Sequence, residues 1–349
     1  MVGPMALLDD AALQILFYPF ESGALPWPSA GQKTLFLNAQ VTLALRQFDQ
    51  CDLTLQQYFK PYESALQAQG YTALPGLPDE GTSYDVALLA APKNQIETLY
   101  LMAYALEILK SGGLLVVAAG NKAGGGRLAK NMDTLGLYDI CSESRHKARV
   151  VWAYKDNVDK AARKKALAAG QPKEVIDGTF RSWPGIYGWN KVDQGSALLA
   201  QHLPNDLQGK GADFGCGYGY LARRVLAHCA VKSLACLDAD WRALEMARQN
   251  LARPDISAAL EFLWCDCTKH SLRGLDFIVM NPPFHEGKSA DITIGEDFIV
   301  NACHSLKPGG ALWMVANKHL PYEAILKQHF KAFEKIFEAQ GFKVFCAQK

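Results

Sequence analysis

The sequence predicts an α/β protein built from two related halves in tandem. Its 349 residues are enough for about two domains. Leu109–Lys122 aligns with Leu306–Lys318, and each stretch carries a Lys-x-Gly-Gly turn before an apolar run. Upstream, Tyr84–Lys93 aligns with Leu275–Phe284 in the same order and spacing. Each copy is typical of a buried strand, a loop, a helix, a turn and a second strand, which is the pattern of a parallel sheet.

The composition excludes several classes of protein. Hydrophobic residues make up 49% of the chain and charged residues 20%, which excludes a disordered or fibrous protein. The formal net charge of +1 excludes a uniformly basic nucleic-acid coat protein. No apolar run reaches the roughly 18 residues of a spanning helix, and we expect a cytoplasmic protein that is neither inserted in a membrane nor secreted. Nine cysteines without a Cys-x-x-Cys pair predict reduced thiols and no metal site.

A basic segment separates the two halves. Residues 144–173 contain nine Lys or Arg against two acids, a net charge of +7 (nine minus two). We expect a first domain over residues 1–155, a basic linker over 156–178 and a second domain over 179–349. The segment is interpreted either as a solvated linker or as a contact surface for RNA phosphates.

The second half contains a glycine-rich turn between a predicted strand and a helix. In Asp213-Phe-Gly-Cys-Gly-Tyr-Gly219, the glycines Gly215, Gly217 and Gly219 allow a tight turn and bring backbone N–H groups close to a ligand. Asp238 ends the next predicted strand, where an acid can accept hydrogen bonds from both hydroxyls of a ribose. The sequence therefore predicts a Rossmann-like site for an adenosine-containing cofactor.

Two observations favour S-adenosylmethionine over a dinucleotide. The third glycine comes one residue earlier than in the Gly-x-Gly-x-x-Gly pattern of nicotinamide binders. Asp213 precedes the loop, where an acid suits the positively charged amino group of S-adenosylmethionine. Asp266 follows a third strand, and we expect it either to accept a hydrogen bond from adenine N6 or to be an ordinary loop residue.

The candidate catalytic motif is Asn281-Pro-Pro-Phe284, after a fourth apolar strand. Pro282 and Pro283 fix an extended backbone. Asn281 Oδ1 and the Pro282 carbonyl are placed to accept hydrogen bonds from a planar amine, and Phe284 offers a ring for base stacking. Asn is not a base at neutral pH, so its contribution is electrostatic. Without the glycine-rich turn and the acidic strand ends, the same Pro-Pro pair would be interpreted as a stiff turn beside a Phe of the core.

These motifs resemble a class I S-adenosylmethionine-dependent methyltransferase acting on an amino nitrogen. Together with Pro184–Ser196, Val315–Tyr322 and Gly341–Phe345, they are similar to the RsmC/RlmG family, whose members methylate guanine N2 in ribosomal RNA. The resemblance implies two tandem class I methyltransferase domains, the N-terminal one degenerate. It covers most of the chain.

The repeat itself also indicates that the first half is degenerate. Ala90 stands at the position of Asn281, and Lys93 stands at that of Phe284. Residues 30–80 contain no Gly-x-Gly. We therefore expect one active site, in the second half, and a first half that binds no cofactor and serves as a folding partner and RNA-docking platform. His285 and the residues up to Gly295 are expected to form a flap, in which His285 has a structural or base-contacting role.

The resemblance implies transfer of a methyl group from S-adenosylmethionine to the N2 amine of a guanine in ribosomal RNA, and its closer likeness to the small-subunit enzymes implies 16S rRNA. The catalytic residues are Asn281, Pro282, Pro283 and Phe284; the cofactor residues are Asp213, Gly215, Gly217, Gly219, Asp238, Asp266 and Asn281. Methylation of 23S rRNA, of a protein glutamine or of DNA adenine are alternatives, because the same motif serves any planar amide or amine. An RNA-binding assembly factor with a vestigial cofactor fold is the non-enzymatic alternative. A monomer is expected.

Overall fold

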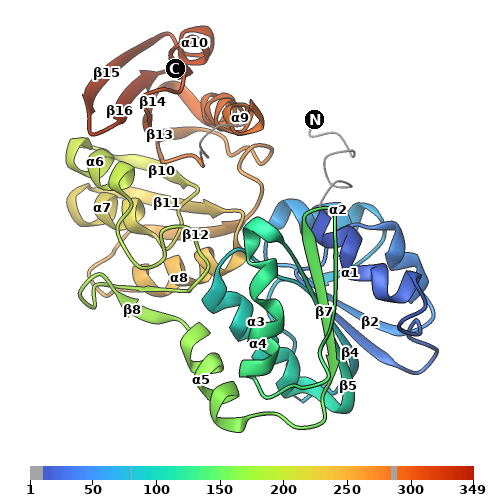
Figure 1. The fold of residues 1–349 in the computed structure, drawn as a ribbon. Coiled ribbons are helices and arrows are strands. Elements are labelled where there is room, and N and C mark those ends of the chain that lie inside the picture. The colour runs from blue at the N-terminus through green and yellow to red at the C-terminus, as the bar shows by residue number, and fades with distance from the viewer. Residues whose placement is uncertain (1–10, 80, 284–288) are drawn as a thin grey trace. The chain divides into compact units, whose positions relative to one another are not determined.

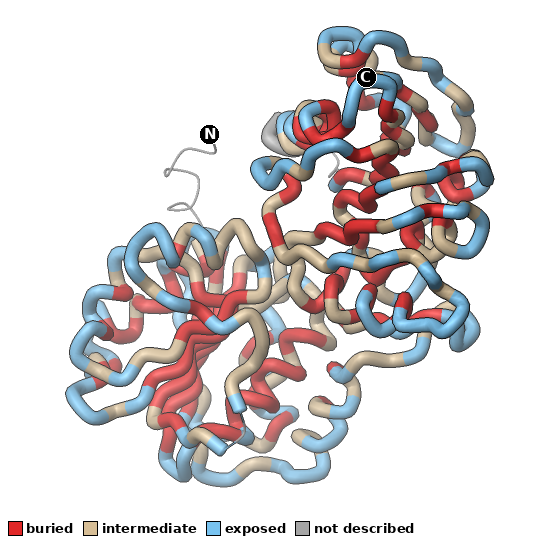
Figure 2. The backbone as a smooth tube through the Cα atoms, turned by 180° about the vertical axis from the view of Figure 1, so that it is seen from behind, coloured by how far each residue is buried: buried red, intermediate tan, exposed pale blue. Residues whose placement is uncertain are grey.

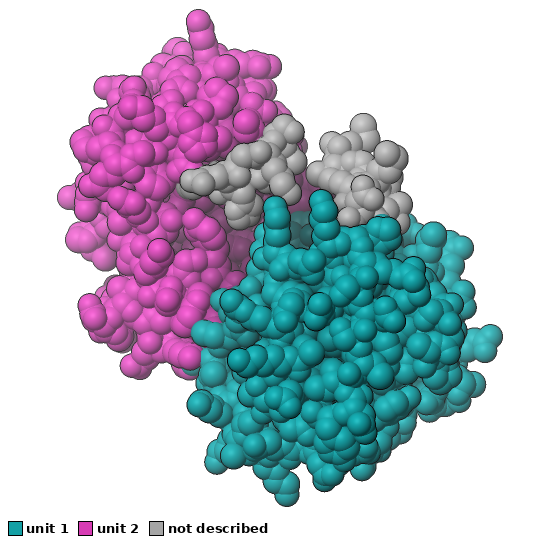
Figure 3. Space-filling view, in the orientation of Figure 1, with its two compact units in different colours: residues 1–172 teal, residues 173–349 magenta. Residues whose placement is uncertain are grey.

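The computed structural model describes residues 11–79, 81–283 and 289–349 and divides the chain into two compact units, Met1–Pro172 and Lys173–Lys349 (Figure 3). Each unit contains one sheet of seven strands with helices on both faces (Figure 1). The prediction of two tandem α/β domains is confirmed.

Unit 1 consists of residues 1–172. Its strands are β1 (Lys33–Leu37), β2 (Asp52–Gln56), β3 (Ala73–Leu74), β4 (Tyr84–Ala90), β5 (Leu109–Gly120), β6 (Cys141–Arg145) and β7 (Ala148–Tyr154). Its helices are α1 (Ala11–Glu21), α2 (Lys60–Ala68), α3 (Gln95–Ile108), α4 (Leu128–Thr134) and α5 (Lys160–Gly170), with 3-10 turns η1 (Leu43–Phe48), η2 (Asn121–Ala123) and η3 (Gly125–Arg127).

Unit 2 consists of residues 173–349. Its large sheet contains β10 (Gly209–Phe214), β11 (Val231–Asp238), β12 (Ala259–Trp264), β13 (Leu275–Met280), β14 (Leu306–Asn317), β15 (Ala332–Ala339) and β16 (Phe342–Gln348), and β8 (Lys173–Val175) pairs with β9 (Phe180–Ser182). Its helices are α6 (Gln194–His202), α7 (Tyr220–His228), α8 (Trp241–Leu251), α9 (Ser289–Ser305) and α10 (Tyr322–His329).

The two sheets share one topology. Their strand orders are β3-β2-β1-β4-β5-β7-β6 and β12-β11-β10-β13-β14-β16-β15, so each strand of unit 1 has a counterpart in unit 2. In each sheet the first five strands pair in parallel, and the last two pairings, through β7 in unit 1 and through β16 in unit 2, are antiparallel. The central strands β4 and β13 are nearly continuous apolar runs because both faces of the sheet are covered there, as the buried strands in Figure 2 show.

Each sheet has a separate hydrophobic core on each face. In unit 1, α3, α4 and α5 cover one face and α1 and α2 the other. In unit 2, α9 and α10 cover one face and α6, α7 and α8 the other. All nine cysteines are free thiols. No helix in the described part of the chain is long and apolar enough to cross a membrane.

The aligned repeat has the same contacts in both units. The Asp85 carboxylate accepts from the Lys33 backbone at 2.8 Å and from Lys110 Nζ at 2.7 Å. Its counterpart Asp276 accepts from the Lys210 backbone at 2.7 Å and pairs with Lys307. The Lys307 ammonium lowers the pKa of the Asp276 carboxyl. The Lys of each Lys-x-Gly-Gly turn therefore binds the Asp at the start of the neighbouring strand.

The basic segment 156–178 is divided between the two units. Helix α5 begins after Asp159, whose carboxylate caps it, and packs on α3. Arg163 pairs with Glu107 of α3 at 2.8 Å. Strand β8 pairs with β9 and belongs to unit 2. The segment predicted to be a linker therefore consists of an ordered helix of unit 1, a short connection and a strand of unit 2.

The packing of α5 on α3 gives a test of this boundary. A Cβ atom at Gly170 would lie 2.2 Å from Cγ of Tyr100, so Gly170→Ala should force α5 away from α3 and lower the free energy of unfolding by about 1–3 kcal/mol. Gly126→Ala is the control, because its Cβ would meet open space and its φ is ordinary. Thermal unfolding of both variants checks this, and equal stability of the two would show that α5 is a loosely attached linker.

Candidate active site

Four parallel strands of unit 2 end at one edge of its sheet. In the register of the sheet, Phe214 of β10 lies beside Leu237 of β11 and Met280 of β13. Asp238 at the end of β11 lies beside Trp264 at the end of β12. The glycine loop and Asp238 therefore lie at the same edge as Asn281, which follows β13. The strand order changes direction between β10 and β13, where ligands bind in open α/β sheets.

The glycine loop has a backbone that other residues rarely adopt. Gly215, Gly217 and Gly219 have φ values of +74°, +56° and +90°. The N–H of Gly215 donates to the Leu237 carbonyl at 2.8 Å, which fixes the turn. A Cβ at Gly219 would lie 3.3 Å from Cα of Ala247 in α8, whereas one at Gly217 would meet no atom of the described residues within 4 Å. Gly219 thus serves packing, and no described residue covers the backbone at Gly217.

Asp213 lies beneath this loop and is fully buried. Its Oδ2 accepts from the Ala222 N–H in the first turn of α7 at 2.9 Å. Its Oδ1 is buried and has no partner among the described residues. Burial raises the pKa of Asp213 to about 7. The predicted cofactor acid is thus a buried acceptor with one oxygen still available.

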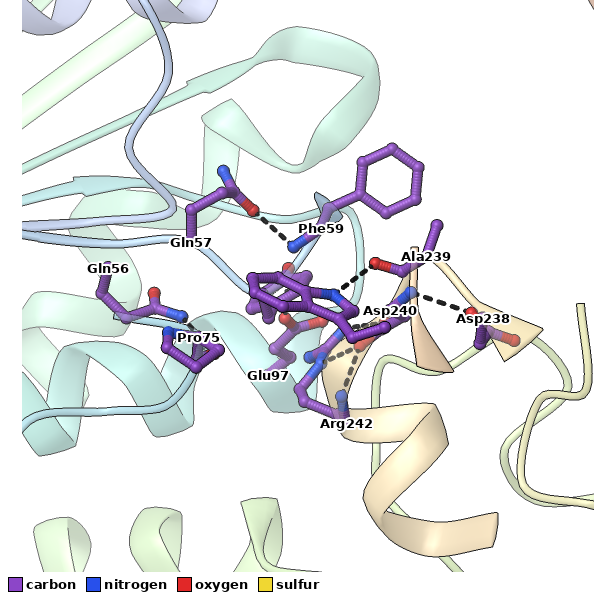
Figure 4. Close-up of polar contacts among 11 residues, drawn as sticks. Gln56, Gln57, Phe59, Pro75, Glu97, Asp238, Ala239, Asp240 and Arg242 are labelled. Atoms are coloured by element: carbon purple, nitrogen blue, oxygen red, sulfur yellow. Dashed lines mark hydrogen bonds and ion pairs between the residues drawn. The ribbon is translucent and has the colours of Figure 1, made fainter. Parts of the chain in front are cut away.

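Asp238 contacts both the glycine loop and the start of α8. Its Oδ2 accepts from the Gly217 N–H at 2.8 Å. Its Oδ1 accepts from the Asp240 N–H at 2.8 Å, as Figure 4 shows. Burial raises the pKa of Asp238 to about 6. Since a carboxylate oxygen has two lone pairs, each oxygen keeps an acceptor position for a hydroxyl group.

Asp266 has a local role in the loop after β12. Its Oδ1 accepts from the Thr268 N–H at 3.0 Å and from Thr268 Oγ1 at 2.6 Å. Its Oδ2 pairs with Lys269 at 3.1 Å. These contacts form a turn of the kind that Asp commonly makes with the following backbone. The interpretation of Asp266 as a loop residue therefore describes its contacts, while contact with adenine stays a prediction.

Asn281 is held by two residues of unit 2. Its Nδ2 donates to Asp193 Oδ2 and to Ser196 Oγ, both at 2.8 Å. Its Oδ1 is buried and has no partner among the described residues. Pro282 is buried and Pro283 exposed. The side chain of Asn281 therefore presents one unused acceptor at the edge that carries the glycine loop.

Two of the predicted residues lie outside the described part of the chain. These are Phe284, the predicted stacking residue, and His285. The flap expected up to Gly295 is not a loop from Ser289 onward, because Ser289–Ser305 forms α9. The described residues include no group of three or more His, Cys, Asp or Glu that could hold a metal ion.

Sequence reasoning assigned no chemical role to Asp193, Ser196 and Tyr218. Asp193 caps α6 by accepting from the Ser196 N–H at 2.8 Å. Tyr218, in the glycine loop, donates to the Lys191 carbonyl at 3.2 Å and ties that loop to the segment before α6. The capping pattern in Asp-Gln-Gly-Ser could have located the start of the helix. It gave no sign that the cap also binds Asn281.

The same edge of unit 1 is built differently. Asn38, with φ of +55°, stands at the position of Gly215, and its Nδ2 donates to the Ala90 carbonyl at 3.1 Å. Gln57 stands at the position of Asp238. Its Nε2 donates to the Ala39 carbonyl at 2.7 Å. Its Oε1 accepts from the Phe59 N–H at 2.9 Å (Figure 4). The side chains of Asn38 and Gln57 are buried where unit 2 has glycine and carboxylate.

Comparison with known proteins identifies the family. A model of the methyltransferase small domain matches residues 177–346. A ribosomal RNA small subunit methyltransferase C from Pseudomonas paraeruginosa is 32% identical over 273 residues, which cover 76% of this chain and 80% of that protein. One from Ectopseudomonas mendocina is 31% identical, with 76% and 80% covered. The chain belongs to the ribosomal RNA small subunit methyltransferase C family. The resemblance inferred from the motifs is thereby confirmed.

A solved structure of the family supports the fold over the whole chain. It is the T. thermophilus 16S rRNA N2 methyltransferase RsmC in complex with AdoMet and guanosine. The TM-score is 0.80 at 23% identity, over 98% of this chain and 92% of that one. Both units therefore have the methyltransferase-like architecture that the family resemblance implies.

The buried carboxyl of Asp213 gives a prediction about pH and stability. Its pKa of about 7 in the folded protein exceeds its ordinary value of 3.8, so the folded state holds the proton more tightly than the unfolded chain. The associated stability is full below about pH 4 and is lost as the pH rises to about 7. Asp213→Asn should therefore gain stability relative to wild type by roughly 1.4 kcal/mol per pH unit in that window.

Denaturant unfolding at pH 4.5, 5.5, 6.5 and 7.5 measures this difference. Replacing the exposed Asp206 by Asn is the matched control and should leave the pH dependence unchanged. A constant difference between Asp213→Asn and wild type across these values would contradict the raised pKa.

Proposed function

We propose that unit 2 transfers a methyl group from S-adenosylmethionine to the exocyclic N2 amine of a guanine in 16S ribosomal RNA. The observation that carries the proposal is the unused amide oxygen of Asn281 beside the glycine loop. The names of the relatives support the choice of small-subunit RNA, and the solved relative contains both AdoMet and guanosine.

The residues at the sheet edge fit this cofactor. Asp238 keeps an acceptor position on each oxygen for the two ribose hydroxyls. The orphaned Oδ1 of Asp213 is a buried acceptor beneath the loop and would accept a hydrogen bond from the ammonium group of this cofactor. No described residue covers the backbone at Gly217, which allows a ligand close approach. When bound, S-adenosylmethionine would supply an electrophilic methyl group on its sulfonium, with S-adenosylhomocysteine as the leaving group.

Asn281 and Pro282 act on the amine that receives the methyl group. Oδ1 of Asn281 and the Pro282 carbonyl accept hydrogen bonds from the two amine protons and direct the nitrogen lone pair toward the methyl group. The amine protons become more acidic as the nitrogen donates that pair, so both acceptors bind the transition state more strongly than the ground state. The methylated nitrogen loses its proton readily, and no general base is needed. Pro283 keeps the backbone extended.

The two acceptors, Asn281 Oδ1 and the Pro282 carbonyl, do not by themselves select the substrate. A glutamine amide, an adenine amine and a guanine amine of 23S rRNA all carry the NH₂ group that Asn281 would bind. The family relationship favours small-subunit RNA, and a direct assay separates these substrates.

We further propose that unit 1 binds no cofactor and docks RNA. The side chains of Asn38 and Gln57 bond to the backbone at the positions where unit 2 keeps Gly215 and Asp238. The loops at this edge carry basic residues instead, and all of them are exposed: Lys93, Lys122, Arg127, Arg145 and Lys147.

Hydrogen bonds and packing bring these basic loops together. The Asn121 N–H donates to the Lys147 carbonyl at 2.7 Å and joins the loop after β5 to the β6–β7 turn. A Cβ at Gly124 would lie 2.1 Å from Nε2 of Gln95, which shows that this loop also packs on the start of α3. Residues 91–94, 121–131 and 145–147 contain no acidic residue. We name these three segments the basic edge, and its charge suits RNA phosphates.

We also propose that the protein acts as a monomer in the cytoplasm, where ribosomal subunits are assembled. Light scattering coupled to size-exclusion chromatography measures the molar mass in solution and so tests whether the protein is a monomer.

Methyl transfer to defined substrates tests the proposed reaction. Small subunits and 16S rRNA from cells lacking this protein should receive one N2-methylguanosine, whereas large subunits, DNA and protein should receive none. Asn281→Ala should bind S-adenosylmethionine normally and lower turnover by about 10²- to 10³-fold, as expected for removal of one preorganised hydrogen-bond acceptor. Methyl transfer to any of the other substrates but not to 16S rRNA would overturn the substrate assignment.

The basic edge predicts a loss of RNA affinity without loss of cofactor affinity. Replacing Lys93, Lys122, Arg127 and Lys147 by Ala should raise KM for the RNA substrate. The slope of log affinity against log salt should fall by roughly 2–4, about one for each phosphate that the variant no longer binds. Lys164→Ala with Lys165→Ala on α5 tests the other basic surface and should have little effect. An unchanged salt slope in the four-residue variant would exclude the basic edge as the docking surface.

A further inference from the structure

Both amide protons of Asn281 have acceptors supplied by the start of α6. Nδ2 donates to Asp193 Oδ2 and to Ser196 Oγ, each at 2.8 Å. These two acceptors use the full donor capacity of the amide nitrogen. The amide oxygen Oδ1 is the remaining hydrogen-bonding atom of this side chain, and it has no partner among the described residues.

The Asp193 carboxylate determines which way the Asn281 amide faces. An ionised carboxylate only accepts hydrogen bonds, so it binds the NH₂ group and repels the amide oxygen. Rotating the amide by half a turn would place Oδ1 against Asp193 and leave the two amide protons without these acceptors. Hydrogen bonds to charged groups are stronger than neutral ones, so the observed orientation is strongly preferred.

Asp193 itself is fixed by its surroundings. Its Oδ2 also accepts from the Ser196 N–H at 2.8 Å, and its Oδ1 accepts from Tyr187 Oη at 3.3 Å. Helix α6 packs on β14 and β16. A Cβ at Gly195 would lie 3.0 Å from the Phe342 ring, so glycine lets the first turn of α6 approach β16. The acceptors of the Asn281 amide therefore belong to a helix end that the sheet holds in place.

We propose that Asp193 and Ser196 are positioning residues for methyl transfer. They hold the Asn281 amide so that its oxygen alone faces the amine of the substrate. This inference rests on the proposed function of unit 2, because it concerns the same reaction. It gives Asp193 and Ser196 of the Asp-Gln-Gly-Ser sequence a role in the reaction in addition to the capping of α6.

Helix capping alone does not account for these contacts. The cap is complete with the bond from the Ser196 N–H to Asp193, and the Ser196 hydroxyl takes no part in it. That hydroxyl instead accepts from Asn281, which lies 85 residues further along the chain. Ser196→Ala therefore removes a hydrogen bond to Asn281 and leaves the cap intact.

A double-mutant cycle separates positioning from a structural role. Ser196→Ala should lower kcat by about 3- to 10-fold and Asp193→Ala by about 10- to 100-fold, both less than the decrease in Asn281→Ala. In the Asn281→Ala background, neither substitution should lower kcat further, because they act through the missing amide. Affinity for S-adenosylmethionine, measured by calorimetry, should stay the same in all variants.

An exchange of the two side chains provides a rescue experiment. Asn281→Asp alone places two carboxylates together and should lower kcat strongly. Adding Asp193→Asn removes one carboxylate, lets an amide nitrogen donate to the carboxylate at position 281, and should recover at least about tenfold in kcat over Asn281→Asp. The amide nitrogen then occupies the position of Asp193 Oδ2, so the capping bond from the Ser196 N–H is given up in the exchange. Asp159→Ala, which removes the cap of α5 in unit 1, controls for the loss of a helix cap.

The outcomes distinguish this inference from the proposed function. A wild-type protein without methyl transfer to any RNA would overturn the proposed function. A wild-type protein that is active, with additive decreases of kcat in the cycle and no rescue by the exchange, would overturn the positioning role alone. If Asp193→Ala proves unstable, Ser196→Ala carries the test by itself.

Discussion

The parallel pairing of β10 with β11 and β13 is the constraint on which the site depends. It ends three strands at one edge, and so places the glycine loop, Asp238 and Asn281 together although they are separated by many residues along the chain. Hydrogen bonds then refine the positions of these groups: Leu237 fixes the loop backbone, Asp238 contacts Gly217, and the start of α6 holds Asn281. The chemistry is electrostatic, and it therefore requires acceptors whose directions are set before the substrate arrives.

The two units show how one scaffold supports different roles. Both keep the strand order and the pair between an Asp and the Lys of the Gly-Gly turn. The residues at the carboxyl edge differ in their chemistry. Unit 2 has glycine and carboxylate there and leaves acceptors unused, whereas unit 1 has Asn38 and Gln57, whose amides bond to its own backbone. In our interpretation, the loops of unit 1 at this edge hold no cofactor, and the basic edge that they form binds RNA instead.

Several features could be predicted from the sequence because their signals are local. The repeat revealed both sheets, and glycine spacing and the strand ends located Gly215, Asp238 and Asn281. The roles of Asp193 and Ser196 could not be predicted, because they arise from contacts across 88 and 85 residues of sequence. Asp266 shows a related difficulty, since its position at a strand end suits a ligand while its own neighbour Thr268 binds it. Helix α5 was ambiguous because its basic composition suits a linker, whereas its packing on α3, which includes the close approach of Gly170 to Tyr100, is not visible in the sequence.

The direction of the Asn281 amide is the central claim, and a crystal structure of the protein with S-adenosylhomocysteine and guanosine tests it most directly. We expect Oδ1 of Asn281 to lie within hydrogen-bonding distance of guanine N2 while Nδ2 stays on Asp193 and Ser196. A structure in which the amide nitrogen faces the base, or in which the base binds away from the carboxyl edge of unit 2, would contradict the account.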